Sequence, residues 1–311
     1  MKSLRLVFMG TPEFAVPMLD ALRQSAHEVV AVITAPDKPA GRGRMVQQSE
    51  VKQYAVAHEL PLLQPEKLKN PEFLEELRSY QADLFVVVAF RMLPEVVWNM
   101  PNLGTINLHA SLLPQYRGAA PINWAIINGE TETGVTTFRL QQEIDTGNLL
   151  FQESISIRPN ETVGELYQEL MQLGTGVLLK TVNAMASGDF KEIPQPTHDA
   201  LKSAPKIFKE NCAIHWHQTS NQCYNLIRGL SPYPAAFTTI AGKQLKVYAA
   251  IKKERVAGLA PGQFRTDGKT YLEFGTADGA LSLTDIQLEG KKRMGIEEFF
   301  RGNRLPSNDS I

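Results

Sequence analysis

The chain has 311 residues and a hydrophobic fraction of 43%, which is enough for about two domains of roughly 150 residues each. Two cysteines, Cys212 and Cys223, are too few for a disulfide framework and favour free thiols in a reducing compartment. The N-terminal apolar run is too short for a signal peptide, and no segment approaches the roughly 20 apolar residues that span a bilayer. These features predict a cytoplasmic protein that does not associate with membranes.

The formal net charge is −1, but charge is unevenly distributed along the chain. From Lys191 to the end, 17 Lys and Arg residues stand against 12 Asp and Glu residues, so this part carries +5 and the remainder −6. A basic C-terminal part permits a polyanionic partner such as a nucleic acid. A charge of this size is also ordinary for a solvated surface, so it does not require such a partner.

The first elements alternate between short apolar runs and helical patterns. The run at residues 4–9 ends in Gly10 and predicts a buried strand. A helix should follow it, because Thr11 can cap and Pro12 suits the first turn. Further strands are predicted at residues 28–33, 84–89 and 104–109. Strands that alternate with helices predict a parallel sheet covered by helices on both faces.

Gly10, at the end of a predicted strand, raises the alternative of a dinucleotide-binding turn. That fingerprint needs three glycines, whereas residues 10–15 contain one. Pro12 also lacks the backbone N–H that a phosphate would use. The sequence therefore favours a tight strand-to-helix turn over the cofactor site of a dehydrogenase.

A long helix and then a change of pattern follow. Apolar residues at helical spacing predict a helix at 161–186, and the prolines at 194 and 196 cannot continue it. Beyond residue 206, short alternating runs are separated by Asp267-Gly268 and Asp278-Gly279, which predict hairpins and a small all-β barrel domain. The expected organisation is an α/β domain at 1–189, a linker at 190–206 and a β domain at 207–311.

The segment at residues 104–114 carries the most informative polar side chains. In a strand, Asn107 and His109 share one face and their apolar neighbours occupy the other. Such a polar pair is costly to bury without partners. Near the carboxyl end of a parallel strand it would point into the crevice where open α/β sheets bind ligands. We therefore interpret the pair as a candidate functional site, although a lone buried histidine is usually structural.

Asp145-Thr146-Gly147 is the second candidate motif. The same three residues occur in aspartic proteases, which need two such aspartates that share one proton. This chain has one Asp-Thr-Gly and no Asp-Ser-Gly, so a single-chain protease is disfavoured. Taken alone, the motif would be interpreted as a turn.

Taken together, these motifs resemble the formyltransferases that use 10-formyltetrahydrofolate. The matching segments are Asn107-x-His109, Ser111-Leu112-Leu113-Pro114, Arg117-Gly118-Ala119-Ala120-Pro121-Ile122 and Asp145-Thr146-Gly147, together with residues 8–15 and 36–43. The resemblance runs through essentially the whole chain. It implies a Rossmann-like formyltransferase domain at 1–189 followed by an OB-like barrel, in agreement with the strand pattern.

The resemblance also implies roles for individual residues. Asn107, His109 and Asp145 would form the catalytic set. Asn107 and a protonated His109 would donate to the oxygen of a tetrahedral intermediate, and Asp145 would hold the imidazole. The donor would be 10-formyltetrahydrofolate, and no metal is implied. The turn beside the folate would consist of Ser111, Leu112, Leu113 and Pro114.

The acceptor is implied by a narrower likeness to the members that formylate methionyl-tRNA. The Gly-Arg-Gly loop and the second domain at 207–311 carry this likeness. The reaction would place the formyl group on the α-amino group of methionyl-initiator tRNA, and a monomer is expected. The residues predicted to bind tRNA are Lys38, Arg42 and Arg44. Further basic residues of the second domain are Lys243, Lys246, Lys252, Lys253, Lys291, Lys292 and Arg293.

Two alternatives remain open at this point. A formyltransferase that acts on a small amine, such as an amino sugar or a purine precursor, can share Asn107, His109 and Asp145. A non-catalytic RNA-binding protein is the other alternative, and the intact catalytic set argues against it. The chain departs from the family pattern at Phe90-Arg91, where the family usually has Tyr-Gly, and at Asn148. The pterin contacts around residues 90 and 91 are therefore left open.

Overall fold

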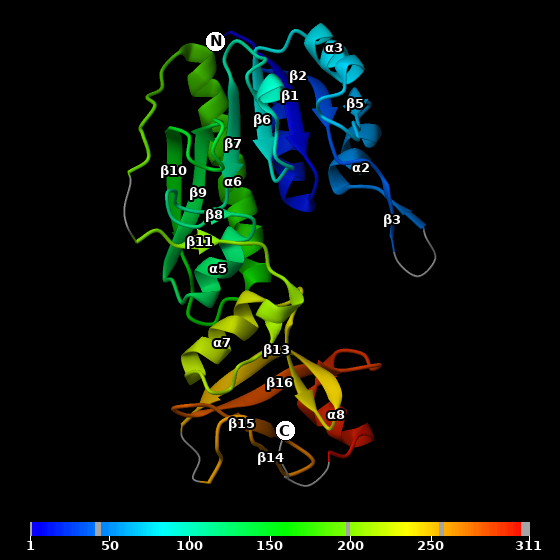
Figure 1. The fold of residues 1–311 in the computed structure, drawn as a ribbon, viewed down its shortest axis with the longest axis vertical. Helices are drawn as coiled ribbons and strands as arrows, with labels where there is room; N and C mark the ends of the chain where they lie inside the picture. The colour runs from blue at the N-terminus through cyan, green and yellow to red at the C-terminus, as the bar shows by residue number, and fades with distance from the viewer. Residues whose placement is uncertain (1, 41–44, 197–199, 255–257, 306–311) are drawn as a thin grey trace. The chain divides into compact units, whose positions relative to one another are not determined.

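The computed structural model describes residues 2–40, 45–196, 200–254 and 258–305 (Figure 1). The chain forms two compact units. The first unit consists of Met1–Gly118, Gly134–Ile155 and Tyr167–Ser203. The second unit consists of Ala119–Thr133, Ser156–Leu166 and Ala204–Ile311. The boundaries 1–189 and 207–311 stay a prediction.

A seven-stranded sheet with the order β10-β9-β7-β6-β1-β2-β5 forms the centre of the first unit. Its strands are β1 (Arg5–Gly10), β2 (Glu28–Ile33), β5 (Leu62–Leu63), β6 (Leu84–Val88), β7 (Thr105–His109), β9 (Glu132–Arg139) and β10 (Leu149–Ser156). The pairings from β5 through β2, β1 and β6 to β7 are parallel, as predicted. The pairing of β9 with β7 is antiparallel, which the sequence analysis did not predict.

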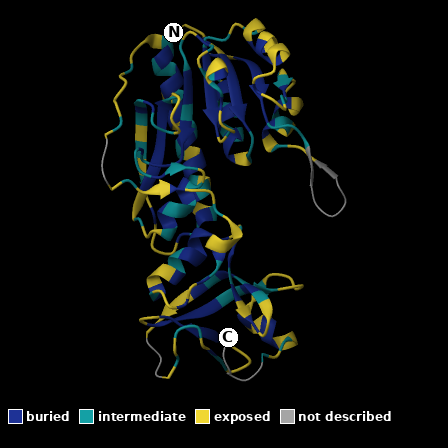
Figure 2. Cartoon of the chain, in the orientation of Figure 1, coloured by how far each residue is buried: buried dark blue, intermediate teal, exposed yellow. Residues whose placement is uncertain are grey.

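Helices cover both faces of this sheet, and Figure 2 shows its central strands as buried, whereas the edge strand β10 also has exposed residues. The helices are η1 (Glu13–Ala15), α1 (Val16–Arg23), α2 (Glu50–Ala57), α3 (Pro71–Ser79), α4 (Glu95–Trp98) and α6 (Val163–Ser187). Residues of α3 and α4 form one apolar core with Val7 and Met9 of β1. Gly174 of α6 packs on the opposite face, where an added Cβ would lie 2.8 Å from atoms of Leu108 and Met18. The two-residue strands β8 (Arg117–Gly118) and β11 (Ser203–Ala204) lie outside the sheet.

The turn after β1 is a close approach of backbone to backbone. A Cβ on Gly10 would lie 2.8 Å from Ala15 Cβ and 3.1 Å from the Val88 carbonyl oxygen, so only glycine fits. The predicted cap by Thr11 is wrong: η1 begins after Pro12 without a side-chain cap. The Ala15 N–H instead donates to the Pro12 carbonyl at 3.0 Å, so a 3-10 turn satisfies the backbone there.

The second unit contains an antiparallel sheet with the order β12-β13-β16-β15-β14 and a short β17 paired with β16. Its strands are β12 (Ala236–Ile240), β13 (Lys243–Lys253), β14 (Phe264–Thr266), β15 (Leu272–Gly275), β16 (Ala280–Leu288) and β17 (Met294–Gly295). Asp267-Gly268 joins β14 to β15 and Asp278-Gly279 joins β15 to β16, so both predicted hairpins are confirmed. Four helical segments accompany the sheet: α5 (Pro121–Ile127), η2 (Lys209–Cys212), α7 (Ser220–Gly229) and α8 (Ile296–Gly302).

Within the second unit, α5 packs closely against α7. The Asn123 side-chain amide donates to the Gly229 carbonyl at 2.8 Å. A Cβ on Gly229 would lie 2.6 Å from Ile127 Cγ1, so the helices meet where α7 has no side chain. Ile127 also packs against the apolar core that the C-terminal sheet forms. Across the whole described part of the chain, no helix is long and apolar enough to cross a membrane.

Cys212 and Cys223 are free thiols buried in the second unit. Burial raises the pKa of both thiols, that of Cys223 to about 11. Because the thiolate is the reactive form, we expect iodoacetamide at pH 8 to alkylate both cysteines far more slowly in the native protein than in urea. Mass spectrometry of quenched time points measures both rates. Native labelling as fast as that of the unfolded chain would contradict the buried positions.

Candidate active site

His109 ends β7 and is 8% exposed. Its Nε2 lies 2.8 Å from the carbonyl oxygen of Tyr116. Because a carbonyl can only accept, Nε2 carries a hydrogen and donates it. The other ring nitrogen, Nδ1, lies 3.8 Å from Oδ2 of Asp145, whose side chain is 12% exposed. The structure therefore brings His109 and Asp145 together, with Nδ1 as the ring nitrogen that faces the carboxylate.

Asp145 is held by one hydrogen bond to its side chain and one to its main-chain carbonyl. Its Oδ2 accepts from the backbone N–H of Gly118 at 3.0 Å. Its own carbonyl accepts from the side chain of Gln195 at 2.8 Å. Asp145 has a φ of 54°, in the left-handed region that non-glycine residues rarely adopt. The carboxylate is thus fixed between the Gly118 amide and the imidazole of His109.

Asn107 lies two residues before His109, on the same face of β7. Its Oδ1 is buried and has no hydrogen-bond partner among the described residues. An unsatisfied buried acceptor costs about 1–3 kcal/mol unless a ligand supplies a donor. The side chain is therefore suited to accept from an N–H group of a substrate bound at this end of the strand.

The turn after β7 is held from inside the protein. The Ser111 hydroxyl is fully buried and donates to the carbonyl of Gln115 at 2.7 Å. The Thr136 hydroxyl donates to the Ser111 carbonyl at 2.6 Å. It also accepts from the backbone N–H of Leu113 at 3.2 Å. Ser111 therefore shapes this turn. The half-buried side chains, which remain available to a ligand, are those of Leu112 and Pro114.

Strand β3 (Lys38–Ala40) pairs antiparallel with β4 (Met45–Gln47), and this hairpin extends from the first unit (Figure 1). Lys38 begins β3, whereas Arg42 and Arg44 lie outside the described residues. At the base of the hairpin, Asp37 accepts from Gln64 at 2.9 Å and from Lys52 Nζ at 2.6 Å. The Gln64 hydrogen bond and the Lys52 charge lower the pKa of Asp37.

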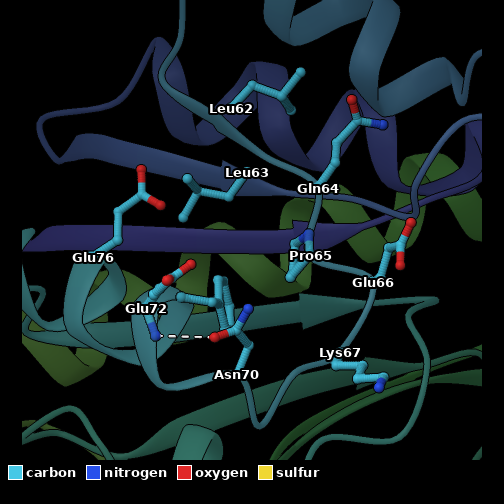
Figure 3. A pocket seen from close by; sticks show the side chains of 10 residues that line it. Leu62, Leu63, Gln64, Pro65, Glu66, Lys67, Asn70, Glu72 and Glu76 are labelled. Atoms are coloured by element: carbon cyan, nitrogen blue, oxygen red, sulfur yellow. Dashed lines mark hydrogen bonds between the residues drawn. The ribbon is translucent and has the colours of Figure 1, made fainter.

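A cavity of about 650 Å³ lies between β5 and α3 (Figure 3). Its wall contains none of the predicted site residues, and β5 is the edge strand, four positions from β7 in the sheet. The Arg91 guanidinium donates to the carbonyls of Glu66 and Pro65, which belong to this wall. Arg91, one of the two positions where the sequence departs from the pattern it resembles, thus links the segment after β6 to the wall of this cavity. The lining residues are Leu62, Leu63, Gln64, Pro65, Glu66, Lys67, Asn70, Glu72, Phe73 and Glu76.

Three contributors to this site were missed by the sequence analysis. Tyr116 supplies a carbonyl to His109, Gly118 supplies an amide to Asp145, and Gln195 supplies its side-chain amide to the Asp145 carbonyl. Arg117 and Gly118 belong to one of the motifs that carry the family resemblance, and nothing else in the sequence pointed to this segment. Gln195 carried none, because a residue between two prolines is typical of a linker. Among the described residues, no three potential metal ligands lie together.

Two family models match the chain. The model described as "Formyl transferase" matches residues 4–182, and "Formyl transferase, C-terminal domain" matches residues 206–304. Among solved structures, one that is similar is the N-formyltransferase from Helicobacter canadensis in complex with folinic acid and dTDP-3-aminofucose. The TM-score is 0.67 and the sequence identity 21%, over 90% of this chain and 98% of that chain. This likeness establishes the fold alone.

HypX from Aquifex aeolicus, solved in complex with tetrahydrofolic acid, is similar at a TM-score of 0.66 and 21% identity. The match covers 98% of this chain and 49% of HypX, so the chain spans about half the length of that protein. The α/β domain followed by a β-rich domain, as predicted from the sequence, is thus confirmed as a known formyltransferase fold.

Relatives of higher identity match almost end to end. Methionyl-tRNA formyltransferase from Bacteroides fragilis is 53% identical, over 98% of this chain and 96% of the relative. The enzyme of the same name from Parabacteroides distasonis is 54% identical, over 97% and 96%. The chain belongs to the methionyl-tRNA formyltransferase family, which confirms the family resemblance inferred from its motifs.

Proposed function

We propose that this chain transfers the formyl group of 10-formyltetrahydrofolate to the α-amino group of methionyl-initiator tRNA. Family membership over nearly the whole length carries the proposal. The geometry at the end of β7 supports it, because His109, Asp145 and the unsatisfied Asn107 Oδ1 converge where an acyl transfer needs donors and acceptors. The reaction would take place in the cytoplasm, where charged tRNA and reduced folates meet.

The chemistry is an acyl transfer between two nitrogens. The neutral amine of methionine attacks the formyl carbon and a C–N bond forms, giving a tetrahedral intermediate with a negative oxygen. The bond from that carbon to N10 of the folate then breaks. One proton leaves the attacking nitrogen and one is added to N10, so the reaction is balanced without an external acid or base. The folate formamide is already activated, and no serine or cysteine nucleophile is needed.

His109 carries the proton in this scheme. Its Nε2–H is engaged by the Tyr116 carbonyl, so Nδ1 is the nitrogen that exchanges a proton with the substrate. The Asp145 carboxylate, 3.8 Å away, stabilises the imidazolium that forms when Nδ1 is protonated. Asn107 contributes an uncharged amide that can accept from the attacking amine through Oδ1 and donate through its NH₂ group.

Basic residues outside this site supply the contact with tRNA. The first group of such residues comprises Lys38, at the start of β3, together with Arg42 and Arg44. In the second unit some cations are already engaged: Arg293 pairs with Asp285 at 2.5 Å, and Lys252 donates to Asn221 at 2.9 Å. Exposed lysines of the same unit remain for phosphate contacts, which make affinity depend on salt. They are Lys243, Lys253, Lys291 and Lys292.

A comparison of three acceptors tests the proposed function. The purified chain is incubated with 10-formyltetrahydrofolate and charged initiator tRNA, charged elongator tRNA, or a nucleotide-linked amino sugar. We expect formylation of the initiator species at a kcat/KM far above the other two. Preference for the amino sugar would instead favour the small-amine alternative, and no transfer to any acceptor would favour the non-catalytic one.

Arg42→Ala should weaken the use of tRNA while leaving the chemistry intact. We expect a higher KM for tRNA, an almost unchanged kcat, and a salt dependence of tRNA binding that falls by roughly one phosphate contact. Binding measured between 50 and 200 mM salt gives that slope. Arg78→Ala, at an exposed position on α3, is the matched control. If folate binding fell as much as tRNA binding, Arg42 would have a different role.

A further inference from the structure

We propose that Gln195 is a positioning residue that holds Asp145 against His109 by clamping the Asp145–Gly147 loop to the Tyr116–Gly118 segment. This inference rests on the proposed function, because its effect on turnover requires the formyl-transfer reaction. Among the described residues, the hydrogen bonds of Gln195 join it to Arg117 and to the backbone carbonyls of Asp145 and Gly147, not to the His109 ring or the Asp145 carboxylate. It would therefore act through those residues rather than on the substrate.

Gln195 uses both ends of its side-chain amide. Its Nε2 donates to the carbonyls of Asp145 and Gly147, each at 2.8 Å. Its Oε1 accepts from Arg117 Nη2 at 2.6 Å and from Arg117 Nε at 3.1 Å. A carboxylate could accept from the guanidinium but could not donate to the two carbonyls. A lysine could donate but could not accept from Arg117, so an amide is the side chain that suits all four contacts.

The two segments joined by this amide carry the described contacts of the catalytic pair. Arg117 lies between Tyr116, whose carbonyl orients His109, and Gly118, whose N–H orients Asp145. On the other side of the clamp, Asp145 has a φ of 54°, which its backbone holds only with outside support. Gln195 bonds to the carbonyl of this strained residue and thereby fixes the direction of its side chain.

The far end of this loop packs closely against β9. A Cβ on Gly147 would lie 1.6 Å from the Arg139 carbonyl oxygen, so the loop already touches β9. Without Gln195, the Asp145 carbonyl loses its donor and the left-handed conformation loses its support. A displacement of about 1 Å in a catalytic geometry can lower the rate by up to about 10²-fold. The expected defect lies in kcat, because the surfaces proposed to bind folate and tRNA do not include Gln195.

Two variants separate the parts of the clamp. Gln195→Ala removes all four hydrogen bonds, and Gln195→Glu retains the acceptor for Arg117 but removes both donors to the loop. We expect each to lower kcat by about 10- to 100-fold, with KM for folate and tRNA within about threefold of wild type. Similar losses in the two variants would assign the effect to the bonds with the loop.

Glu192→Gln is the matched control. Glu192 belongs to the same segment but accepts from Arg139 at 2.7 Å and from Asn148 at 3.1 Å, two residues outside the catalytic set. Its kcat should stay within about twofold of wild type. Equal losses in the control and in Gln195→Ala would mean that any loosening of the segment is sufficient, which would overturn the specific role of Gln195.

Hydrogen exchange tests the clamp independently of catalysis. The Gly118 amide is protected by its bond to the Asp145 carboxylate, so Gln195→Ala should accelerate its exchange while amides of β1 and β6 keep their protection. Unchanged Gly118 exchange together with a wild-type kcat would overturn the inference. If the wild-type protein did not formylate methionyl-tRNA, the proposed function would fail, and the exchange result would still decide whether Gln195 holds Asp145.

Discussion

Replacing His109 with alanine is expected to lower kcat by about 10²–10⁴-fold, the usual contribution of a positioned acid–base group. The imidazole is the side chain at the end of β7 that can pass a proton between the attacking and the leaving nitrogen. Its removal also takes away the hydrogen bond from Nε2 to the Tyr116 carbonyl. Single-turnover formylation of charged tRNA measures the chemical step separately from product release.

Two companion variants make this result specific. His109→Gln keeps an amide that can donate to Tyr116 but cannot carry a proton, so it should be nearly as slow as the alanine variant. His58→Ala, at an exposed position after α2, should keep wild-type turnover. Melting temperatures close to wild type establish that each variant is folded. Full activity in a folded His109→Ala protein would remove the residue from the mechanism.

Replacing Asp145 with asparagine is expected to lower kcat by about 10²–10³-fold, the scale for the loss of one preorganised electrostatic partner. The amide preserves the size of the side chain and can still accept from the Gly118 N–H. What it loses is the negative charge 3.8 Å from His109 Nδ1, which stabilises the imidazolium. The defect should therefore appear in the chemical step, and folate binding should change by less than about threefold.

The control for this variant is Asp189→Asn, at an exposed position just after α6. It removes the same charge from the first unit at an exposed site outside the pairing of His109 with Asp145. Calorimetry with a stable folate analogue measures binding, and single-turnover rates measure chemistry. Folate binding that fell in parallel with kcat would indicate that Asp145 shapes the folate site instead of acting through His109.

Most parallel strands of the first unit were predictable because they are short, mainly apolar runs; in β7 the apolar residues alternate with Asn107 and His109. Glu28–Ile33 was located without error, and β1, β6 and β7 to within one residue at each end. The antiparallel β9 was missed, because threonines lie on both of its buried faces, where Thr136 bonds to the backbone and Thr137 to another side chain. Hydrophobic patterning does not detect a strand whose burial depends on hydrogen bonds.

The site was predictable only in part, for a related reason. Asn107 and His109 are two apart in one strand, so their shared face follows from local geometry. The approach of Asp145 depends on a bond to Gly118, 27 residues earlier, and on Gln195, 50 residues later. The motif alone indicated a turn, but not that Asp145 itself would take the left-handed conformation. No local pattern encodes contacts of that separation.

The packing of α5 on α7 has a consequence for synthesis on the ribosome. About 100 residues separate the two helices, so at 5–20 residues per second α5 emerges roughly 5–20 s before its partner. Ile127, the α5 side chain that meets α7 at Gly229, has no α7 to cover it during that interval. The nascent chain therefore carries this face of α5 without its partner helix for nearly a third of its elongation. A stalled or truncated chain that ends before residue 220 would present this helix as a binding site for chaperones.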